Sequence, residues 1–351
     1  MRTIRLLSGL CCVLAFGCNA RDPVQTVQER FYAMGTWVDV IFESPDAATS
    51  RAALADVEAA LRELERDYYP WAAGELADLN GRIAAGRGSD VSDGLAQLLR
   101  RAQELSARSE GLFEPGLGSL VELWGFHSTD VTYREPPSDS AIGAALEASG
   151  GIAALRIDGR HVESPRTGLK IDLGGIAKGA AVGWTIELLE SHDIAAALVN
   201  AGGDLAATGR APGDRPWRIG IRHPRRDGLL GSLELADGES AFTSGDYERY
   251  YERGGRRMHH LLDPRTGRPV THTQAVTVIA NDPVLADAAA TALFVAGPDR
   301  WLEIADRLGI ASALRVGASG GVEMTESMAA RLQPSGADHD MIMGSGREQA
   351  R

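Results

Sequence analysis

The chain has 351 residues and a formal net charge of −12, and 44% of its residues are hydrophobic. This length and apolar content suffice for one large domain or two smaller ones. An acidic chain without a basic stripe argues against nucleic acid as a partner. All three cysteines precede residue 19, which excludes a disulfide framework, a cysteine-ligated zinc site and thiol catalysis from the folded body.

The N-terminal segment has the pattern of an export signal. Arg2 and Arg5 are followed by an apolar run over residues 6–16, which is too short to span a bilayer permanently. The run ends in Leu-Ala-Phe-Gly-Cys, which resembles the lipobox of bacterial lipoproteins, so we expect Cys18 to be acylated and to anchor the protein to a membrane. Ala15 and Phe16 depart from the commonest lipobox residues, and plain secretion is therefore the alternative.

The segment boundaries follow from this interpretation. Residues 1–17 are expected to be a signal peptide, 18–28 a lipidated polar tether, 29–332 the folded domain and 333–351 a disordered polar tail. Asn19 is not the aspartate that typically retains lipoproteins at the inner membrane. The expected location is thus the outer membrane, with the protein facing the periplasm.

Hydrophobic periodicity predicts the elements of the folded domain. A strand is expected over residues 31–42, where apolar side chains alternate, and a helix over 46–68, where they recur at helical spacing. Ser92 is a good N-cap for a second helix that ends at Gly111, and residues 112–126 are expected to be a loop.

The remaining predicted elements are mostly strands. Helices are expected over residues 138–149, 176–190, 283–295 and 298–308, and strands over 154–157, 169–173, 196–199, 217–221, 231–235 and 275–279. Strand-rich segments with a few helices, without a regular alternation of strand and helix, predict an α+β fold with mixed, largely antiparallel sheets and packed helices.

A glycine turn after the predicted strand 169–173 is the first motif that suggests a ligand. Residues 172–179 read Asp-Leu-Gly-Gly-Ile-Ala-Lys-Gly. Glycines allow close approach of backbone to a ligand, and a helix N-terminus with Lys178 in its first turn attracts an anion. A plain strand-to-helix turn explains the same pattern, so the motif alone leaves both interpretations open.

Three further motifs carry polar side chains. Residues 200–204 read Asn-Ala-Gly-Gly-Asp and are typical of a tight turn. Residues 243–247 read Thr-Ser-Gly-Asp-Tyr, and His260 precedes an Asp-Pro-Arg-Thr-Gly turn, where an imidazole is either a general base or a structural residue. Asp287 and Thr291 are four residues apart and so share a helix face. Their oxygens would suit magnesium. In the alternative interpretation, Asp287 stabilises the helix dipole and Thr291 is an ordinary helix residue.

Together and in this order, the motifs resemble those of the ApbE family of FAD:protein FMN transferases. They are Met-Gly-Thr at 34–36, the 172–179 stretch, the 200–204 and 243–247 motifs, His-x-x-Asp-Pro-Arg-Thr-Gly at 260–267 and Ala-Asp-x-x-x-Thr-Ala at 286–292. The resemblance extends over about residues 31–321, so that the folded domain, 29–332, would be a transferase domain with an ApbE-like fold. Lipoprotein anchoring is also common in that family.

The resemblance implies a site for FAD and Mg²⁺. Asp287 and Thr291, with the carbonyl of Gly175, would hold the metal. Contacts with the flavin nucleotide are implied for Met34, Trp71, Phe113, Glu114, Asp172, Lys178 and Leu261. Glu114 replaces the family's usual aspartate, and the family's aromatic–proline–serine stretch is altered here to Tyr69-Pro70-Trp71. The stacking aromatic is assigned to Trp71, with Tyr69 as the alternative.

The implied reaction is attack on the FMN-side phosphorus of FAD by a threonine hydroxyl of an exported flavoprotein, with release of AMP. His260 is the candidate base and Asp246 the second candidate. The chain lacks the acceptor motif Asp-x-x-[Ser or Gly]-Gly-Ala-Thr, so it is expected to modify a partner. A metal-dependent FAD pyrophosphatase that yields FMN and AMP, and a periplasmic FAD-binding lipoprotein, are the alternative functions.

Overall fold

The computed structural model describes residues 25–128, 135–335 and 341–343, so that the predicted signal peptide and the lipidated Cys18 lie outside the described residues. The helices are α1 Ala47–Tyr68, α2 Glu75–Ala84, α3 Asp93–Arg108, α4 Gly118–Trp124, α5 Asp139–Ser149, the 3-10 helix η1 Ile152–Ala154, α6 Ala177–Ser191, α7 Pro283–Ala296, α8 Trp301–Leu308 and α9 Glu326–Arg331. Within the described part of the chain, none of them has the length and apolar character needed to cross a membrane.

The strands are mostly short. They are β1 Gln25–Ala33, β2 Thr36–Ser44, β3 Ser89–Asp90, β4 Arg156–Asp158, β5 His161–Glu163, β6 Ala197–Ala201, β7 Asp204–Thr208, β8 Trp217–Arg222, β9 Leu229–Leu235, β10 Ser240–Gly245, β11 Tyr250–Arg253, β12 Arg256–His259, β13 Leu262–Asp263, β14 Arg268–Pro269, β15 Thr273–Ala280, β16 Ser312–Gly317, β17 Val322–Met324, β18 Gln333–Pro334 and β19 Met341–Met343.

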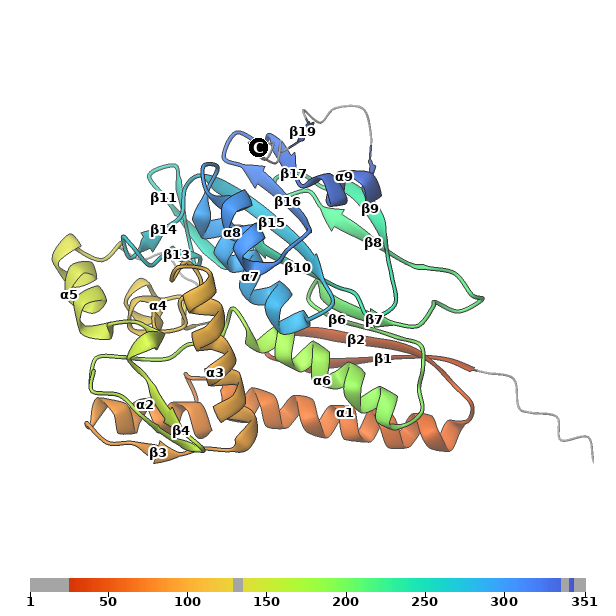
Figure 1. Cartoon of the computed structure of the whole chain (residues 1–351), viewed down its shortest axis with the longest axis horizontal. Helices are drawn as coiled ribbons and strands as arrows, with labels where there is room; N and C mark the ends of the chain where they lie inside the picture. Colours follow the sequence, from red (N-terminus) through yellow and green to blue (C-terminus); the bar gives the residue numbers. More distant parts are fainter. Residues whose placement is uncertain (1–24, 129–134, 336–340, 344–351) are drawn as a thin grey trace, which may run out of the picture.

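One large sheet organises the molecule (Figure 1). Within the described residues its order is β1-β2-β6-β7-β10-β15-β16-β17-β19. Neighbouring strands are antiparallel except β17 and β19, which are parallel. The predicted α+β class with a mixed, largely antiparallel sheet is therefore confirmed.

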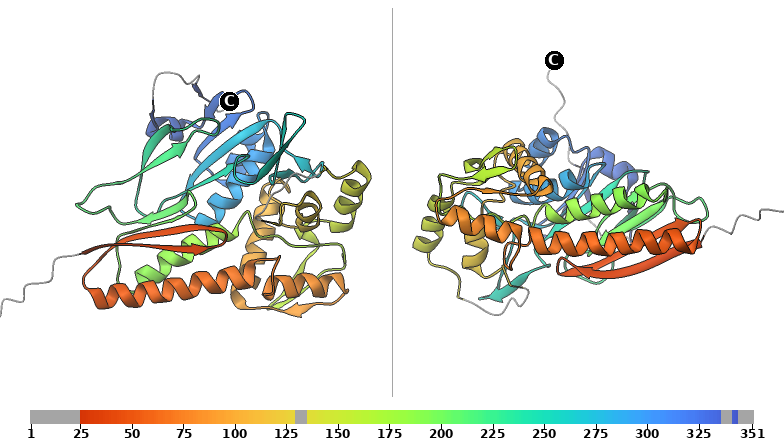
Figure 2. Two further views of the ribbon diagram at one scale, coloured as in Figure 1. Left: turned by 180° about the vertical axis from the view of Figure 1, so that it is seen from behind. Right: turned by 90° about the horizontal axis from the view of Figure 1, so that it is seen from below.

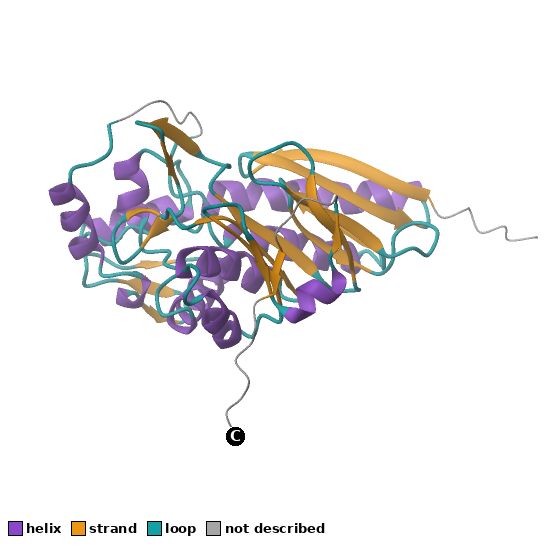
Figure 3. Ribbon diagram, turned by 90° about the horizontal axis from the view of Figure 1, so that it is seen from above, coloured by secondary structure: helices purple, strands orange, loops and turns teal. Residues whose placement is uncertain are grey.

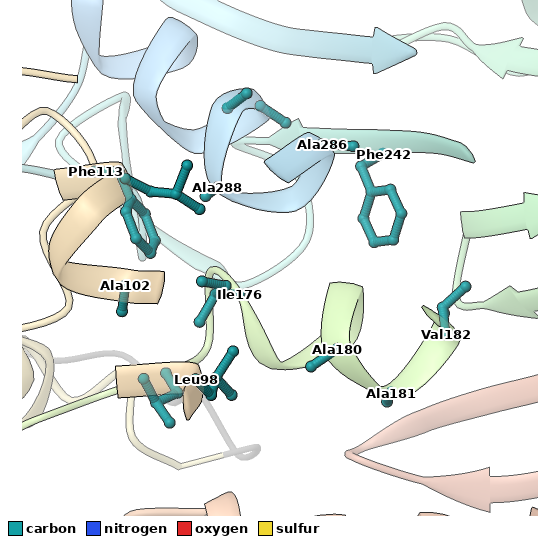
Figure 4. Close-up of a cluster of buried hydrophobic side chains, with 14 of the residues drawn as sticks. Leu98, Ala102, Phe113, Ile176, Ala180, Ala181, Val182, Phe242, Ala286 and Ala288 are labelled. Atoms are coloured by element: carbon teal, nitrogen blue, oxygen red, sulfur yellow. The ribbon is translucent and has the colours of Figure 1, made fainter. Parts of the chain in front are cut away.

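Helices α1, α6 and α7 pack on one face of this sheet (Figure 3). The apolar residues of α1 recur at helical spacing, and Val57 and Leu61 are buried with Val38 and Val40 of β2. Figure 4 shows the next part of the same cluster, where small alanines of α6 and α7 lie near Phe242 of β10. Small side chains at this contact let the two helix backbones approach closely.

The other face of the sheet is covered only in part. The sheet β18-β9-β8 and helix α9 form a second apolar cluster against it. Helices α2 to α5 and strands β3 to β5 gather beside the main sheet as a smaller lobe (Figure 2). Leu120 and Trp124 of α4 pack there with Ile142 of α5. This lobe and the main sheet together frame the site described below.

The two long predicted helices are confirmed with their caps. Asp46 accepts hydrogen bonds from the amides of Ala48 and Thr49 at 2.8 Å, and α1 follows it directly. Ser92 accepts a bond from the amide of Leu95 at 3.2 Å at the start of α3. In both helices a side chain accepts hydrogen bonds from free amides of the first turn. Such capping residues can be recognised in the sequence.

The predicted single strand over 31–42 is wrong. The segment instead forms two strands of a hairpin, β1 and β2, whose turn lies at Met34 and Gly35 with φ of 53° and 71°. Two consecutive positive φ angles make the tight turn that reverses a hairpin. Strand β1 begins at Gln25, inside the segment expected to be a tether. The composition of residues 25–28 is polar, and these residues form a strand because they pair with β2.

Other predicted boundaries also differ from the structure. Residues 169–173 form only an isolated bridge, Leu117 to Lys170, so the predicted strand is absent from this described segment. The expected loop over 112–126 contains α4, and α2 was not predicted. Strands β18 and β19 lie within the expected tail 333–351. Each of these depends on a partner distant in sequence, which local periodicity does not reveal.

Helices α6 and α7 lie close together at Gly179. A Cβ atom added there would lie 2.5 Å from the carbonyl oxygen of Pro283 and 2.9 Å from the Cα of Val284. Both are backbone atoms, which cannot move aside without shifting α7. The absence of a side chain at Gly179 therefore sets the distance between the two helices that carry Lys178 and Asp287.

We predict that Gly179→Ala lowers the free energy of unfolding by about 1–3 kcal/mol, since overpacking forces the backbones apart. Denaturant titration followed by circular dichroism measures it. Gly183→Ala in the same helix is the control, because its Cβ would lie 3.4 Å from the Pro283 ring, an ordinary contact. That variant should be neutral or more stable by up to about 1 kcal/mol. Equal stability of the two variants would contradict the close-packing explanation.

Candidate functional site

A cleft of about 590 Å³ opens between the main sheet and the smaller lobe. All the residues predicted to bind the flavin nucleotide or the metal line it: Met34, Trp71, Phe113, Glu114, Asp172, Gly175, Lys178, Leu261, Asp287 and Thr291. Of the two predicted catalytic residues, His260 lines the cleft as well. Residues from the β1–β2 turn to α7 thus meet in one cavity.

Lys178 lies in a buried group of opposite charges. Its ammonium forms an ion pair with the carboxylate of Asp204, whose side chain is 4% exposed, and the other Asp204 oxygen accepts the Thr243 amide at 2.8 Å. Burial acts to lower the pKa of Lys178, but Asp204 and Asp287 outweigh it and raise this pKa to about 12. Lys178 is therefore charged at neutral pH and held at the cleft wall.

Asp287 joins the N-terminus of α6 to α7. Its Oδ2 accepts the amide of Gly179 at 2.8 Å, in the first turn of α6. Burial raises the pKa of Asp287 to about 7, although Lys178 opposes this shift. A cation bound beside this buried carboxylate would stabilise its charged form, so the site favours cation binding.

Thr291, one turn after Asp287 on α7, brings a hydroxyl to the glycine turn. Thr291 Oγ1 lies 3.2 Å from Ser244 Oγ, and a Cβ atom at Gly175 would lie 3.3 Å from Thr291 Oγ1. The hydroxyl of Thr291 and the backbone of the glycine turn are thus adjacent. Within the described residues there is no cluster of three or more His, Cys, Asp or Glu that could hold a metal. The donors present are instead one carboxylate, hydroxyls and backbone carbonyls, which fit a hard cation that keeps other ligands from substrate or water.

His260 presents a neutral imidazole to the cleft. Its Nδ1 lies 3.3 Å from the carbonyl oxygen of Arg249, to which it donates, and this leaves Nε2 as an acceptor. Burial and then the positive charge of Arg249 hold the pKa of His260 well below 6.5. The unprotonated form that accepts a proton is accordingly present at neutral pH.

Asp246, the second candidate base, does not line the cleft, so the structure does not bring it together with the other predicted site residues. It is buried, and Arg225 donates to its two oxygens at 2.7 and 2.5 Å. Arg257 lies 3.4 Å from the same carboxylate. The two guanidinium groups thus engage the carboxylate oxygens of Asp246 in a buried ion-pair cluster. Its neighbour Glu248 lines the cleft instead.

Glu114 and Asp172 are both occupied by backbone amides. Glu114 Oε1 accepts bonds from Gly116 at 2.7 Å and Ile152 at 2.6 Å, and thereby joins two loops of the smaller lobe. Asp172 accepts the Gly174 amide at 2.8 Å and shapes the glycine turn. Burial raises the pKa of each carboxyl. These acids shape the cleft wall as well as lining it.

Trp71 separates the main cleft from a second cavity of about 400 Å³. Lys170 Nζ lies 4.3 Å from the centre of its ring, and the rings of Trp71 and His127 are 5.4 Å apart. Such contacts hold an aromatic face in place. Trp71 is therefore the flat apolar wall expected for stacking with a planar ligand.

Sequence reasoning missed several residues of the site. For Asp204 the motif predicted only a tight turn. The signal that could have marked it as a site residue is an acid directly after two glycines beside a strand. Ser244 stood in a recognised motif without an assigned role. Arg249 and Tyr32 line the cleft, but no local pattern marked them, because the elements that bring them there are distant in sequence.

Comparison with known sequences connects this cleft to a family. The sequence profile of the ApbE family matches residues 34–314. A FAD:protein FMN transferase of Rhodobacter capsulatus is 41% identical over 94% of this chain, and the match covers 62% of that protein, somewhat less than two thirds of its length. A FAD:protein FMN transferase of Klebsiella pneumoniae is 31% identical, over 86% of this chain and 88% of its own length.

Solved structures give the same result. The ApbE protein of Thermotoga maritima is similar with a TM-score of 0.80 and 32% identity, over 87% of this chain and 99% of its own. The apo flavinyl transferase ApbE of Pseudomonas stutzeri is similar with a TM-score of 0.78 and 33% identity, over 90% and 98%. With a matching profile over most of the described residues, the same fold and these relatives, the chain belongs to the ApbE family.

Proposed function

We propose that this chain transfers the FMN moiety of FAD to a threonine hydroxyl of an exported partner protein and releases AMP. The observation that carries the proposal is the single cleft in which a charged Lys178, the oxygen donors around Asp287 and the neutral imidazole of His260 meet. Membership of the ApbE family and likeness to proteins named FAD:protein FMN transferase support it.

FAD fits the chemistry of the cleft wall. Trp71, Phe113, Met34 and Leu261 supply apolar surface for flat rings, and the first turn of α6 with Lys178 attracts phosphate. The cavity next to Trp71 extends the space available to a long dinucleotide. We assign the pyrophosphate to the α6 end of the cleft, because the ammonium of Lys178 and the positive end of the α6 dipole are there.

The oxygen donors fit a magnesium ion. Asp287, Thr291 and the carbonyl of Gly175 would hold it, with substrate phosphate and water as further ligands. When bound, the ion neutralises charge that develops on the pyrophosphate oxygens. Lys178 does the same from the protein side, since its pKa of about 12 keeps it charged throughout the physiological range.

The transfer itself needs one proton acceptor. The threonine oxygen of the partner forms a bond to the FMN-side phosphorus, and the bond from that phosphorus to the AMP oxygen breaks. His260 Nε2 takes the hydroxyl proton, because Nδ1 is directed to the Arg249 carbonyl. Although the pKa of His260 is low in the free protein, the negative pyrophosphate beside it would raise that pKa and favour the protonated product.

Product analysis tests the proposal. With FAD, magnesium and an acceptor domain that carries Asp-x-x-Gly-Gly-Ala-Thr, the protein should yield AMP and covalently bound FMN in equal amounts. EDTA should abolish both products, and Asp287→Asn should remove magnesium-dependent turnover while circular dichroism stays unchanged. Free FMN as the only flavin product would identify a hydrolase, and bound FAD without any product would identify a binding protein.

We predict separate effects for His260 and Lys178. His260→Ala should slow single-turnover transfer by about 100- to 10,000-fold and leave FAD affinity unchanged, because loss of a base acts on the transition state. Lys178→Ala should also weaken FAD binding by about tenfold or more, since its loss exposes the pyrophosphate to Asp204 and Asp287. Flavin fluorescence titration measures binding. Loss of FAD affinity in His260→Ala would make that histidine a ligand contact instead.

We also propose that the protein is exported and anchored by a lipid on Cys18, at the outer membrane and facing the periplasm. The export-signal pattern and the lipobox-like sequence of residues 14–18 support this location. Two or more acyl chains hold a protein stably at a bilayer.

Fractionation of cells that express the full chain tests the anchor. Wild-type protein should sediment with membranes, and Cys18→Ser should appear in the soluble fraction. Cys12→Ser, six residues earlier in the same segment, is the matched control and should still sediment. If wild-type protein and Cys18→Ser partition alike, the anchor assignment is wrong.

A further inference from the structure

Two large aromatic side chains are exposed side by side next to the cleft. Tyr32 of β1 and Trp37 of β2 lie directly opposite each other in the hairpin, and their solvent-exposed fractions are 61% and 55%. Their rings meet edge to face with centroids 5.2 Å apart. We call them the aromatic pair. An exposed cluster of large aromatics beside a functional cleft marks an interaction surface.

The exposure follows from the face that the pair occupies. Ala33 and Val38 follow Tyr32 and Trp37 in the sequence and so lie on the opposite face of the hairpin. Both are buried in the main apolar cluster with α1. On the face of the pair, Ile41 packs against the second cluster, below the β8–β9–β18 sheet. That cover does not extend to Trp37, which remains 55% exposed. The hairpin end is thus left uncovered beside the cleft, which Tyr32 lines.

A neighbouring ion pair holds the aromatic pair in place. Arg30 and Asp39 face each other one step along the hairpin, with Nε and Oδ1 2.5 Å apart. The guanidinium carbon of Arg30 lies 5.9 Å from the centre of a Trp37 ring. Contacts on two sides reduce the conformational entropy that Trp37 would lose when a partner covers it.

The aromatic pair is continuous with the cleft. Tyr32 lines the cleft, as do the hairpin residues Met34, Gly35 and Thr36. His260 lines the same cleft, so a hydroxyl of a second protein must enter past its mouth to reach that imidazole. A protein large enough to deliver the hydroxyl contacts the surface around the mouth, where the pair stands.

We propose that the aromatic pair docks the acceptor protein and buries Trp37 against an apolar surface beside the target threonine. This inference rests on the proposed transfer function and adds to it a site for the partner. Trp37 contacts the acceptor and does not line the FAD cleft. Aromatic anchors of this kind dominate the binding energy of protein interfaces.

Acceptor titration of a surface variant tests the proposal. Single-turnover transfer is measured against the concentration of the motif-bearing acceptor domain, with FAD and magnesium saturating. Trp37→Ser should raise the half-saturating acceptor concentration about tenfold or more, and FAD affinity by fluorescence should remain unchanged. Trp37→Phe should recover most of the loss. Leu229→Ser is the matched control, because Leu229 is 45% exposed on β9 and does not line the cleft.

The failure of this inference differs from failure of the proposed function. If wild-type protein transfers no FMN, the proposed function fails. If wild-type transfer is normal and Trp37→Ser needs no more acceptor than Leu229→Ser, the docking proposal is overturned. It is also overturned if Trp37→Ser changes only FAD affinity, only binding to phosphatidylglycerol vesicles, or only self-association in sedimentation. The aromatic pair would then bind FAD, a membrane or a second copy of the chain, respectively.

Discussion

The contact between the first turn of α6 and helix α7 is the constraint on which the site depends. Gly179 allows the two backbones to approach, and its amide donates to Asp287 across the contact. Because Lys178 precedes Gly179 and Thr291 lies one turn beyond Asp287, the same contact brings a cation and the oxygen donors together. A wider separation of these helices would leave a buried carboxylate without its amide partner, which is costly in a dry interior.

The charges of the site are balanced by residues from three elements. Asp204 at the start of β7 holds Lys178 and also accepts the Thr243 amide of β10. The carboxylates keep Lys178 charged, while burial opposes ionisation of Asp287. Such a cluster is stable only when each charge has a partner, and two carboxylates here face one ammonium. A cation bound beside Asp287 would offset the second carboxylate.

The cleft also separates two recognition tasks in space. Lys178 and Asp287 line it beside the N-terminus of α6, where the proposed function places the phosphates of the dinucleotide. Its mouth has the aromatic pair, where a second macromolecule would be held by apolar contact. His260 lines the same cleft, and in the proposed reaction its imidazole would have to reach both the phosphorus and the incoming hydroxyl. A hairpin turn, a glycine turn and a helix meet around it.

The capped helices α1 and α3, the α+β class and the motifs of the cleft could be predicted from the sequence, because they depend on local spacing, capping side chains and residue type. The sequence motifs also singled out Asp287, Lys178 and His260, which line one cleft in the structure. Tertiary structure alone decided that residues 25–44 form a hairpin, that 169–173 is not a strand and that Asp246 points into an arginine pair instead of the cleft. Pairing of strands and charges joins residues far apart in the chain, and one-dimensional periodicity contains no information on which partner each will meet.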